Sequence, residues 1–269
     1  MAMHPMLNTA VRAARDAGRV ILRSAERSGS LTVETKQRND FVTEVDRQAE
    51  TAIINRLKKA YPDHAILAEE SGGHGDAEAE YQWIIDPLDG TTNFLHGFPQ
   101  FAVSIALQQG KKLEQAVVYD PVSEELFTAT RGGGAYLNNR RIRVSNRRTL
   151  EGALLGTGFP YRPHQDMERY LKTFRALYPG TAGIRRAGSA ALDLAYVAAG
   201  RLDGFWEFEL KPWDMAAGAL LIREAGGLIT DFQGEGNYLK NGNVLCANPK
   251  LFHQMLQKLE GCLEPEERG

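Results

Sequence analysis

The stretch Trp83–Phe94 constrains the fold most, because a short apolar run leads directly into carboxylates and a glycine. The run Trp83–Ile85 predicts a buried strand, and Asp86 follows at its end. Pro87 cannot donate to a sheet ladder, so we expect the strand to stop there. A carboxylate therefore stands at the end of a buried strand, with a second one, Asp89, shortly after it.

The residue types around this strand end suit two kinds of ligand. The carboxylates of Asp86 and Asp89, with the Leu88 carbonyl, suit a hard cation. Gly90 lets the backbone approach a ligand, and the N–H groups of Gly90 and Thr91 suit a phosphate. The alternative is an acidic turn between a strand and a helix, without a ligand.

The predicted elements change their organisation near residue 145, so we expect an N-terminal half of residues 1–145 and a C-terminal half of residues 146–269. In the first half two amphipathic helices precede consecutive strands, an α+β pattern. The helices are expected at 7–22 and 42–57, and the strands at 65–68, 83–85, 101–107, 114–119 and 126–130. In the second half strands and helices alternate from residue 153 to residue 231, an α/β pattern.

Composition excludes several classes of protein. The net charge of −2 gives no sign of a dominant nucleic-acid or membrane surface. Charged residues interrupt each apolar run near the N-terminus, and no stretch approaches the ~20 apolar residues of a membrane helix. Cys246 and Cys262 make no disulfide framework. We therefore expect a cytoplasmic protein without a membrane partner.

Three motifs together resemble those of the inositol monophosphatase family, its bacterial members above all. They are Asp86–Asn93, Trp213–Ala219 with Glu224–Gly227, and Glu69–Ser71. They follow the family's order with similar spacings, and the resemblance covers nearly the whole chain. It implies an α+β fold, a layered αβαβα sandwich with the metal site between the halves, and a phosphatase activity. We also expect a homodimer.

The resemblance makes Glu69 a metal ligand beside Asp86 and Asp89, and it favours Asp214 as the fourth carboxylate. Oxygen ligands without thiolate or imidazole are typical of magnesium, and the six scattered histidines argue against zinc. Roughly two or three Mg²⁺ ions would offset the repulsion among the carboxylates. Alternatives remain: Asp214 can cap a helix, and Glu69 can be an exposed strand end. Glu70 receives no role.

The catalytic residues also follow from the resemblance. It implies that Asp46 and Thr91 orient the attacking water beside Glu69. A metal ion lowers the pKa of this water, which attacks phosphorus in line, so that no phosphoenzyme is needed. The alternative for Asp46 is structural, because Thr43 and Asp46 have the spacing of a capping box with Asp in place of Glu.

The resemblance gives the substrate contacts as well. It favours Arg185 over Arg186 for a phosphate or hydroxyl contact, and Glu207 for a ring hydroxyl, although Glu207 also fits a solvent-facing strand position. The other expected contacts are Leu88, Asp89, Gly90, Thr91, Gly188, Ser189, Ala190 and Asp214. We expect myo-inositol monophosphate as substrate. Fructose 1,6-bisphosphate, a 3′-phosphonucleotide and histidinol phosphate are the alternatives. Family resemblance further implies inhibition by Li⁺ in place of a weakly held Mg²⁺.

One basic cluster lies outside these motifs, and it consists of Arg140, Arg141, Arg143, Arg147 and Arg148. A solvated face is the first interpretation, and a contact with RNA or protein is the second. Bacterial relatives of the family are associated with RNA polymerase antitermination complexes. A binding role with the RNA polymerase antitermination machinery is therefore the alternative function.

Overall fold

The computed structural model describes residues 3–26, 33–37, 40–76, 78–160 and 165–268, with the side chains of 33–37 and 40–43 left aside. The elements up to residue 141 are α1 (Pro5–Ala25), β1 (Val33–Gln37), β2 (Asp40–Thr43), α2 (Glu44–Ala60), β3 (Ala65–Ala68), β4 (Gly72–His74), β5 (Tyr81–Asp89), α3 (Thr91–Leu95), β6 (Ala102–Gln109), β7 (Lys112–Asp120), β8 (Glu125–Thr130), β9 (Gly134–Leu137) and β10 (Arg140–Arg141). Those after it are β11 (Leu154–Thr157), α4 (Met167–Leu177), β12 (Gly183–Arg185), α5 (Ala190–Ala198), β13 (Gly204–Glu207), α6 (Pro212–Glu224), β14 (Leu228–Thr230), α7 (Tyr238–Asn241), β15 (Val244–Ala247), α8 (Pro249–Glu260) and a 3₁₀ turn (Pro265–Glu267).

Two mixed sheets form the frame of the molecule. The larger has eight strands in the order β10-β9-β8-β7-β6-β5-β3-β4, and only β3 and β5 pair in parallel. The smaller has five strands in the order β12-β11-β13-β15-β14, with β11 parallel to both of its neighbours. β1 and β2 form a separate hairpin. Because parallel β3 and β5 end at the same sheet edge, the residues that follow them meet there.

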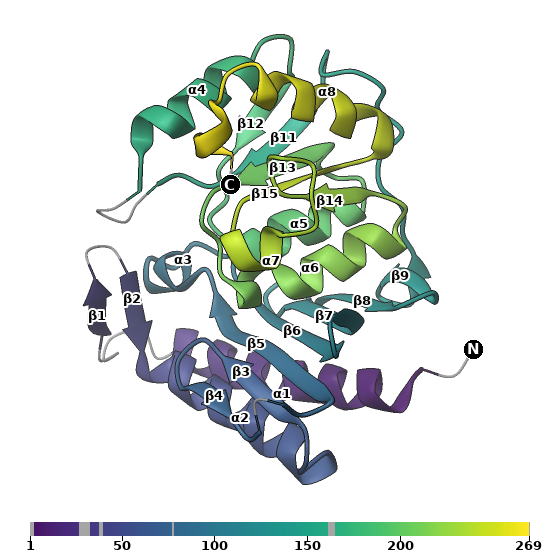
Figure 1. Ribbon diagram of the computed structural model, residues 1–269. Helices are drawn as coiled ribbons and strands as arrows, with labels where there is room; N and C mark the ends of the chain where they lie inside the picture. The colour runs from purple at the N-terminus through teal and green to yellow at the C-terminus, as the bar shows by residue number, and fades with distance from the viewer. Residues whose placement is uncertain (1–2, 27–32, 38–39, 77, 161–164, 269) are drawn as a thin grey trace.

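Helices and sheets stack in five layers (Figure 1). α1 and α2 pack together on one face of the eight-stranded sheet, and α6 packs on the other face. α5 lies beside α6 and packs on the five-stranded sheet, whose outer face is covered by α4 and α8. Buried apolar clusters fill the spaces between these layers. The α+β class and the αβαβα sandwich expected from the sequence are therefore confirmed.

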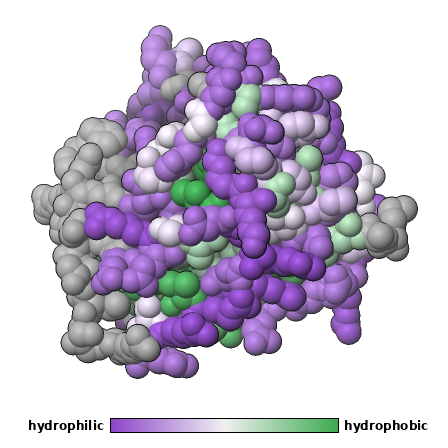
Figure 2. Space-filling model, turned by 90° about the horizontal axis from the view of Figure 1, so that it is seen from below, coloured by the Kyte–Doolittle hydropathy of each residue, from purple (hydrophilic) through white to green (hydrophobic). Residues whose placement is uncertain are grey.

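The outer helices have the amphipathic pattern that this layering requires. In α1 the buried residues recur at helical spacing, among them Ala10, Ala14, Ala17 and Ile21. Figure 2, which views the molecule from below, shows a mainly hydrophilic surface with small separate apolar patches. The apolar faces of α1 and α2 are thus turned toward the sheet. Among the described residues, no helix is long and apolar enough to cross a membrane.

One prediction about the central strand is wrong. β5 does not stop at Pro87 but continues to Asp89. Its pairing with β6 shifts register between Asp86 and Asp89, so Pro87 lies in a β-bulge, where its missing N–H costs no ladder bond. Asn138 and Asn139 both have positive φ and connect β9 to β10 in a tight hairpin.

Candidate functional site

The bulge in β5 puts Asp86 and Asp89 on the same side of the sheet. Side chains alternate along a regular strand, so two residues three positions apart face opposite sides. The bulge adds one residue between them and cancels this alternation. The Leu88 N–H, instead of joining the ladder, donates a 2.9 Å hydrogen bond to Asp86 Oδ1. The proline and the bulge therefore produce a pair of neighbouring carboxylates.

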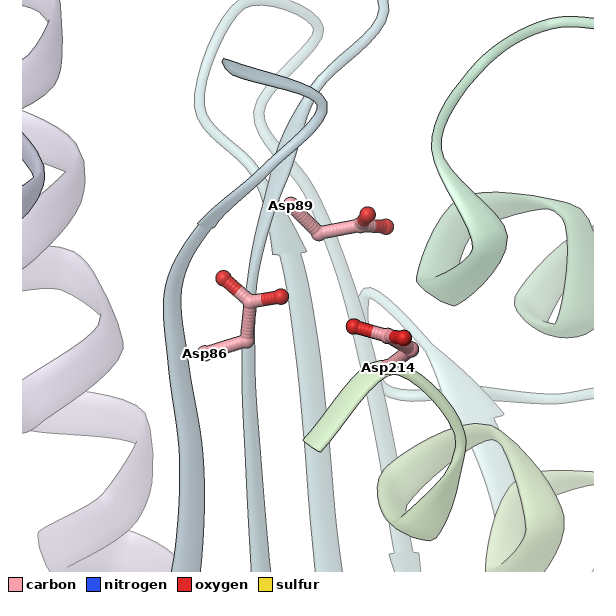
Figure 3. Close-up of side chains that lie close together, drawn as sticks. All are labelled: Asp86, Asp89 and Asp214. Atoms are coloured by element: carbon pink, nitrogen blue, oxygen red, sulfur yellow. The ribbon is translucent and has the colours of Figure 1, made fainter. Parts of the chain in front are cut away.

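A third carboxylate, Asp214, joins this pair from the first turn of α6. Asp86, Asp89 and Asp214 each offer one oxygen, and these oxygens lie within 4.8 Å of one another. Figure 3 shows the three carboxylates gathered around one space between the end of β5 and the start of α6. The Lys211 N–H donates to Asp214 Oδ2 at 2.7 Å. The helix-capping contact weighed in the sequence thus exists, and it holds the carboxylate at the cluster.

Burial raises the proton affinity of two carboxylates in this cluster, Asp86 and Asp89. Burial raises the pKa of Asp86 well above its usual value, and the charges of Glu69, Asp89 and Asp214 raise it further. Burial also raises the pKa of Asp89 to about 6, against the opposing effect of hydrogen bonds from Ser189, Ala191 and Ala190. Ionised carboxylates at this spacing repel each other, and a cation at the centre removes that repulsion.

Glu69 lies against this cluster at the end of β3. Its N–H donates to the Ile85 carbonyl at 3.2 Å, which continues the β3–β5 contact by one residue. A side-chain hydrogen bond and charge from Glu69 both raise the pKa of Asp86, so the two carboxyl groups are neighbours. Glu70 is held differently, because its N–H donates to Glu50 Oε2 in α2 at 2.8 Å. The Glu69 carboxyl group is thus a direct neighbour of Asp86 in the cluster.

Thr91 connects the cluster to α2. It is the first residue of α3, and Gly90 before it has a φ of 99°. A Cβ at Gly90 would lie 2.8 Å from the Gln100 carbonyl oxygen, so only glycine fits this turn. The Thr91 hydroxyl lies 3.0 Å from Asp46 Oδ1 and 3.1 Å from the Leu88 carbonyl. Its single proton is shared between two acceptors, which leaves its oxygen able to accept a hydrogen bond from water.

The start of α5 approaches the cluster from the other sheet. Ser189 caps this helix and donates through its hydroxyl to Asp89 Oδ2 at 2.6 Å. The Ala191 N–H donates to the same oxygen at 2.7 Å, and Ala190 lies between the two. Gly188 has a φ of 89°, which permits the sharp turn before the cap. Two segments that lie far apart in the sequence are thereby joined at Asp89.

The two arginines before this helix lie in different surroundings. Arg185 is exposed at the end of β12, and its guanidinium contacts the Ile184 carbonyl at 3.4 Å. Arg186 lies over the Phe159 ring at 5.5 Å, and its guanidinium is 2.9 Å from where a Cβ on Gly188 would be. Arg186, rather than Arg185, is therefore the arginine beside the turn at Gly188.

Glu207 ends β13 and lies against Gly158, the residue after β11. Its charge and that of Arg186 act in opposite directions on the pKa of Tyr170, which burial raises first. Glu207 therefore shares its surroundings with Arg186, which in turn adjoins Gly188. Among the expected substrate contacts, Glu207 and the turn at Gly188 thus both lie near Arg186.

Two residues of the site have no counterpart in the sequence analysis. Asn93 donates to the Gln100 and Ala187 carbonyls at 2.7 and 2.8 Å, which ties α3 to the turn before α5. Asn93 is the last residue of the motif Asp86–Asn93, but its residue type and position did not indicate a particular role. Asp193 is 2% exposed in α5, and burial, followed by the charge of Asp89, raises its pKa. In the sequence, Asp193 is a single acidic residue in an apolar helix, and this pattern did not indicate that it lies near the cluster.

The residues at the cluster fit Mg²⁺. Carboxylates from Asp86, Asp89 and Asp214, with Glu69 beside them, offer hard oxygen donors and concentrated negative charge. The Leu88 carbonyl lies in the same bulge. Among the described residues, the cluster contains neither a thiolate nor an imidazole, the ligands that transition metals prefer.

The chain is similar to known proteins over nearly its whole length. The sequence profile of the inositol monophosphatase family matches residues 2–264. A Pseudomonas aeruginosa protein named Nus factor SuhB is 58% identical over 268 residues, with 98% of each chain covered. The crystal structure of extragenic suppressor protein SuhB from Bartonella henselae has a TM-score of 0.93 at 46% identity, and the match covers 97% of this chain and 100% of that one. The inositol monophosphatase of Anabaena has a TM-score of 0.83 at 37% identity, with 97% of each chain covered.

Proposed function

Since the chain belongs to the inositol monophosphatase family, we propose that this phosphatase uses Mg²⁺ to hydrolyse small hydroxylated phosphate monoesters, with myo-inositol monophosphate as the first candidate. The observation that carries the proposal is the convergence of Asp86, Asp89 and Asp214 within 4.8 Å of one another. A cluster of carboxylates repels an anionic substrate unless cations lie between the carboxylates and the phosphate. The cluster therefore supports metal-dependent phosphate chemistry.

Bound Mg²⁺ supplies the positive charge that draws the phosphate in and lowers the pKa of water at the site. Asp86, Asp89, Asp214, Glu69 and the Leu88 carbonyl would hold roughly two or three such ions. Hydrogen bonds from the N–H groups of Leu88 and Lys211 hold the carboxylates of Asp86 and Asp214 at the cluster.

Thr91 and Asp46 are proposed to orient the attacking water. The Thr91 hydroxyl donates its proton toward Asp46 Oδ1 and the Leu88 carbonyl, so its oxygen accepts from a water in front of it. Asp46 is fully buried and fixes that hydroxyl. The N–H groups of Gly90 and Thr91 are proposed to contact the phosphate oxygens, and Glu69 to assist the water from the metal side.

The substrate alcohol is proposed to lie between the start of α5 and Glu207. Gly188, Ser189 and Ala190 form that helix start, and Glu207 would accept a hydrogen bond from a ring hydroxyl. Arg185 was the expected cation here, but the position of Arg186 beside Gly188 supports Arg186 as well. A hydroxylated ring has the donors that such a carboxylate requires.

The test is a substrate panel with purified protein in Mg²⁺ and in EDTA. The panel contains myo-inositol 1-phosphate, fructose 1,6-bisphosphate, a 3′-phosphonucleotide, histidinol phosphate and an aryl phosphate. We expect inositol phosphate to give the highest kcat/KM, and all turnover to vanish in EDTA and return with millimolar Mg²⁺. Full turnover in EDTA, with metal content measured as zero, would contradict the proposal.

A second proposed role is binding within the RNA polymerase antitermination machinery. The observation that favours it is the 58% identity to the Pseudomonas aeruginosa relative, which is named as a Nus factor. The candidate contact surface is the exposed cluster Arg140, Arg141, Arg143, Arg147 and Arg148. Arg143 also contacts the Glu224 carbonyl, and Arg147 lies 3.6 Å from Asp203, so the remaining three carry most of the available charge.

Affinity purification from the source lysate tests this second role. Tagged wild type should retain RNA polymerase, and a variant with Glu at Arg140, Arg141 and Arg148 should not. Retention of RNA polymerase by both, or by neither, would contradict the assignment to this surface. The homodimer, the cytoplasmic location and the division at residue 145 stay predictions, and sedimentation of the purified protein checks the first.

A further inference from the structure

Glu207 occupies the space that a side chain at Gly158 would need. A Cβ built on Gly158 would lie 1.9 Å from Glu207 Oε1, 2.0 Å from Cδ and 2.3 Å from Oε2. These separations are far below the ~3.5–4.0 Å of an ordinary contact. The Glu207 carboxylate therefore lies directly on the backbone of Gly158.

Backbone conformation does not require glycine at this position. Gly158 is absent from the glycines with positive φ, so an alanine could adopt its backbone angles. Gly156, two residues earlier in β11, also has an ordinary φ, but a Cβ there would meet Leu202 and Phe205 in the apolar core. Packing explains Gly156, whereas only the Glu207 carboxylate explains Gly158.

Strand pairing sets this contact. β11 and β13 run parallel, and Thr157 pairs with Trp206, so the next residues, Gly158 and Glu207, lie side by side where the strands end. Gly158 is buried and Glu207 is half-buried, so the carboxylate stands at the boundary between the core and the site. A side chain at position 158 would push the carboxylate outward by more than ~1 Å, and misplacement of about 1 Å can cost roughly 10²-fold in rate.

We propose that Gly158 is a specificity-determining position: by carrying no side chain, it sets where the Glu207 carboxylate meets the hydroxyl groups of the substrate. The proposal rests on the proposed function, because it names what positions the hydroxyl acceptor of the same site. Gly158 touches no reacting atom and acts only through Glu207. Its effect should therefore appear with a hydroxylated substrate and be absent with a plain aryl phosphate.

The experiment is a double-mutant cycle with Gly158→Ala, Glu207→Ala and the double variant, assayed on myo-inositol 1-phosphate and p-nitrophenyl phosphate. Gly236→Ala is the matched control, because Gly236 is exposed, has no positive φ and has nothing within 4 Å of its hypothetical Cβ. Gly158→Ala should lower kcat/KM for inositol phosphate roughly 10- to 100-fold and leave aryl phosphate within about twofold. In the Glu207→Ala background it should cause no further loss.

Thermal melts of the same variants give a second reading that does not depend on activity. Gly158→Ala should lower Tm in the presence of Glu207 and leave it unchanged in the Glu207→Ala background, where the obstructing carboxylate is gone. Equal loss on both substrates, or the same loss of Tm in both backgrounds, would overturn the proposal. If wild type hydrolyses aryl phosphate but no hydroxylated phosphate, the proposed substrate class is wrong. That result concerns wild type alone, so it is distinguishable from the outcomes of the double-mutant cycle, which compare variants.

Discussion

The Ser189 hydroxyl donates a 2.6 Å hydrogen bond to Asp89 Oδ2, although the two residues are 100 positions apart in the chain. Asp89 ends β5 of the eight-stranded sheet, and Ser189 caps α5, which packs on the five-stranded sheet. Both this bond and the one from the Ala191 N–H reach the same carboxylate oxygen. Figure 3 shows the Asp89 carboxylate beside the same space as the carboxylates of Asp86 and Asp214.

Ser189→Ala removes both the hydrogen bond to Asp89 and the cap of α5. Loss of a cap costs about 0.5–2 kcal/mol, and loss of a hydrogen bond to a charged group about 1.5–3 kcal/mol. We expect a fall of about 2 kcal/mol in the free energy of unfolding and a higher Mg²⁺ concentration for half-maximal activity. Ser189→Thr, which keeps a hydroxyl, should restore most of both. Unfolding in urea measures the first effect, and unchanged Mg²⁺ activation in Ser189→Ala would show that the bond does not position Asp89.

Thr91→Val should lower kcat while KM changes little. Valine has the shape of threonine but no hydroxyl, so it loses the contacts to Asp46 and Leu88 and the acceptor for water. Positioned proton-transfer groups contribute typically ~10²–10⁴-fold, which sets the expected loss. Thr92→Val, one residue later and exposed, is the matched control. Equal kinetics for Thr91→Val and the control would remove Thr91 from the mechanism.

Lithium should inhibit turnover in a manner uncompetitive with substrate. The expectation follows from the family resemblance of the motifs, which implies that Li⁺ takes the place of a weakly held Mg²⁺ after hydrolysis and traps product phosphate. Steady-state kinetics at several Li⁺ and substrate concentrations checks the pattern, with Na⁺ at the same ionic strength as control. A competitive pattern would argue against a weakly held ion at this cluster.

The stabilisation that Mg²⁺ confers should increase with pH between about 5 and 7.5. Burial raises the pKa of Asp89 to about 6 and that of Asp86 in the same direction, so protons compete with the cation for these carboxylates below about pH 6. Without metal, a raised folded-state pKa contributes stability that is present at low pH and lost as pH rises through about 6. Melts with EDTA and with Mg²⁺ across this range measure the difference. An increment in Tm that is the same at pH 5 and 7.5 would contradict the assignment of Asp89 as a ligand.

The layered fold and the residues of the carboxylate cluster could be predicted, because three motifs resemble those of a known family and this resemblance implies both. Hydrophobic periodicity by itself predicts only the individual helices and strands. The course of β5 could not, since Pro87 normally ends a strand and the bulge that accommodates it depends on pairing with β6. α8 was not predicted, although Asn248 followed by Pro249 is a start signal for a helix.

Contacts between segments that lie far apart in the chain could not be predicted from the sequence either. The bond from Ser189 to Asp89 and the approach of Glu207 to Gly158 depend on how two sheets are placed. Arg185 and Arg186 are adjacent and chemically equal, so only the backbone after β12 decides which of them lies beside Gly188. The sequence supplies candidate groups, and tertiary packing selects among them.

Asp89→Asn tests the metal centre most directly, because it changes the charge of the cluster with little change in shape. The Ser189 hydroxyl and the Ala191 N–H both donate to Oδ2, so the amide oxygen of asparagine can keep these two hydrogen bonds while its NH₂ group takes the place of the other oxygen. An NH₂ group donates and cannot bind a cation. Asp63→Asn is the control, because Asp63 is exposed and precedes β3, whereas Glu69 follows the other end of that strand. Turnover of Asp89→Asn should fall at least ~10³-fold, or roughly 4 kcal/mol of transition-state stabilisation.

The deciding measurement is the pair of thermal melts of wild type and Asp89→Asn, one in EDTA and one in millimolar Mg²⁺, at pH 7.5. In EDTA the variant should melt at the same temperature as wild type or slightly higher, because one repelling charge is gone. In Mg²⁺ the order should reverse, because wild type gains binding energy that the variant lacks. A variant that melts well below wild type in EDTA, or one that Mg²⁺ stabilises as much as wild type, would contradict the assignment of Asp89 to the metal centre.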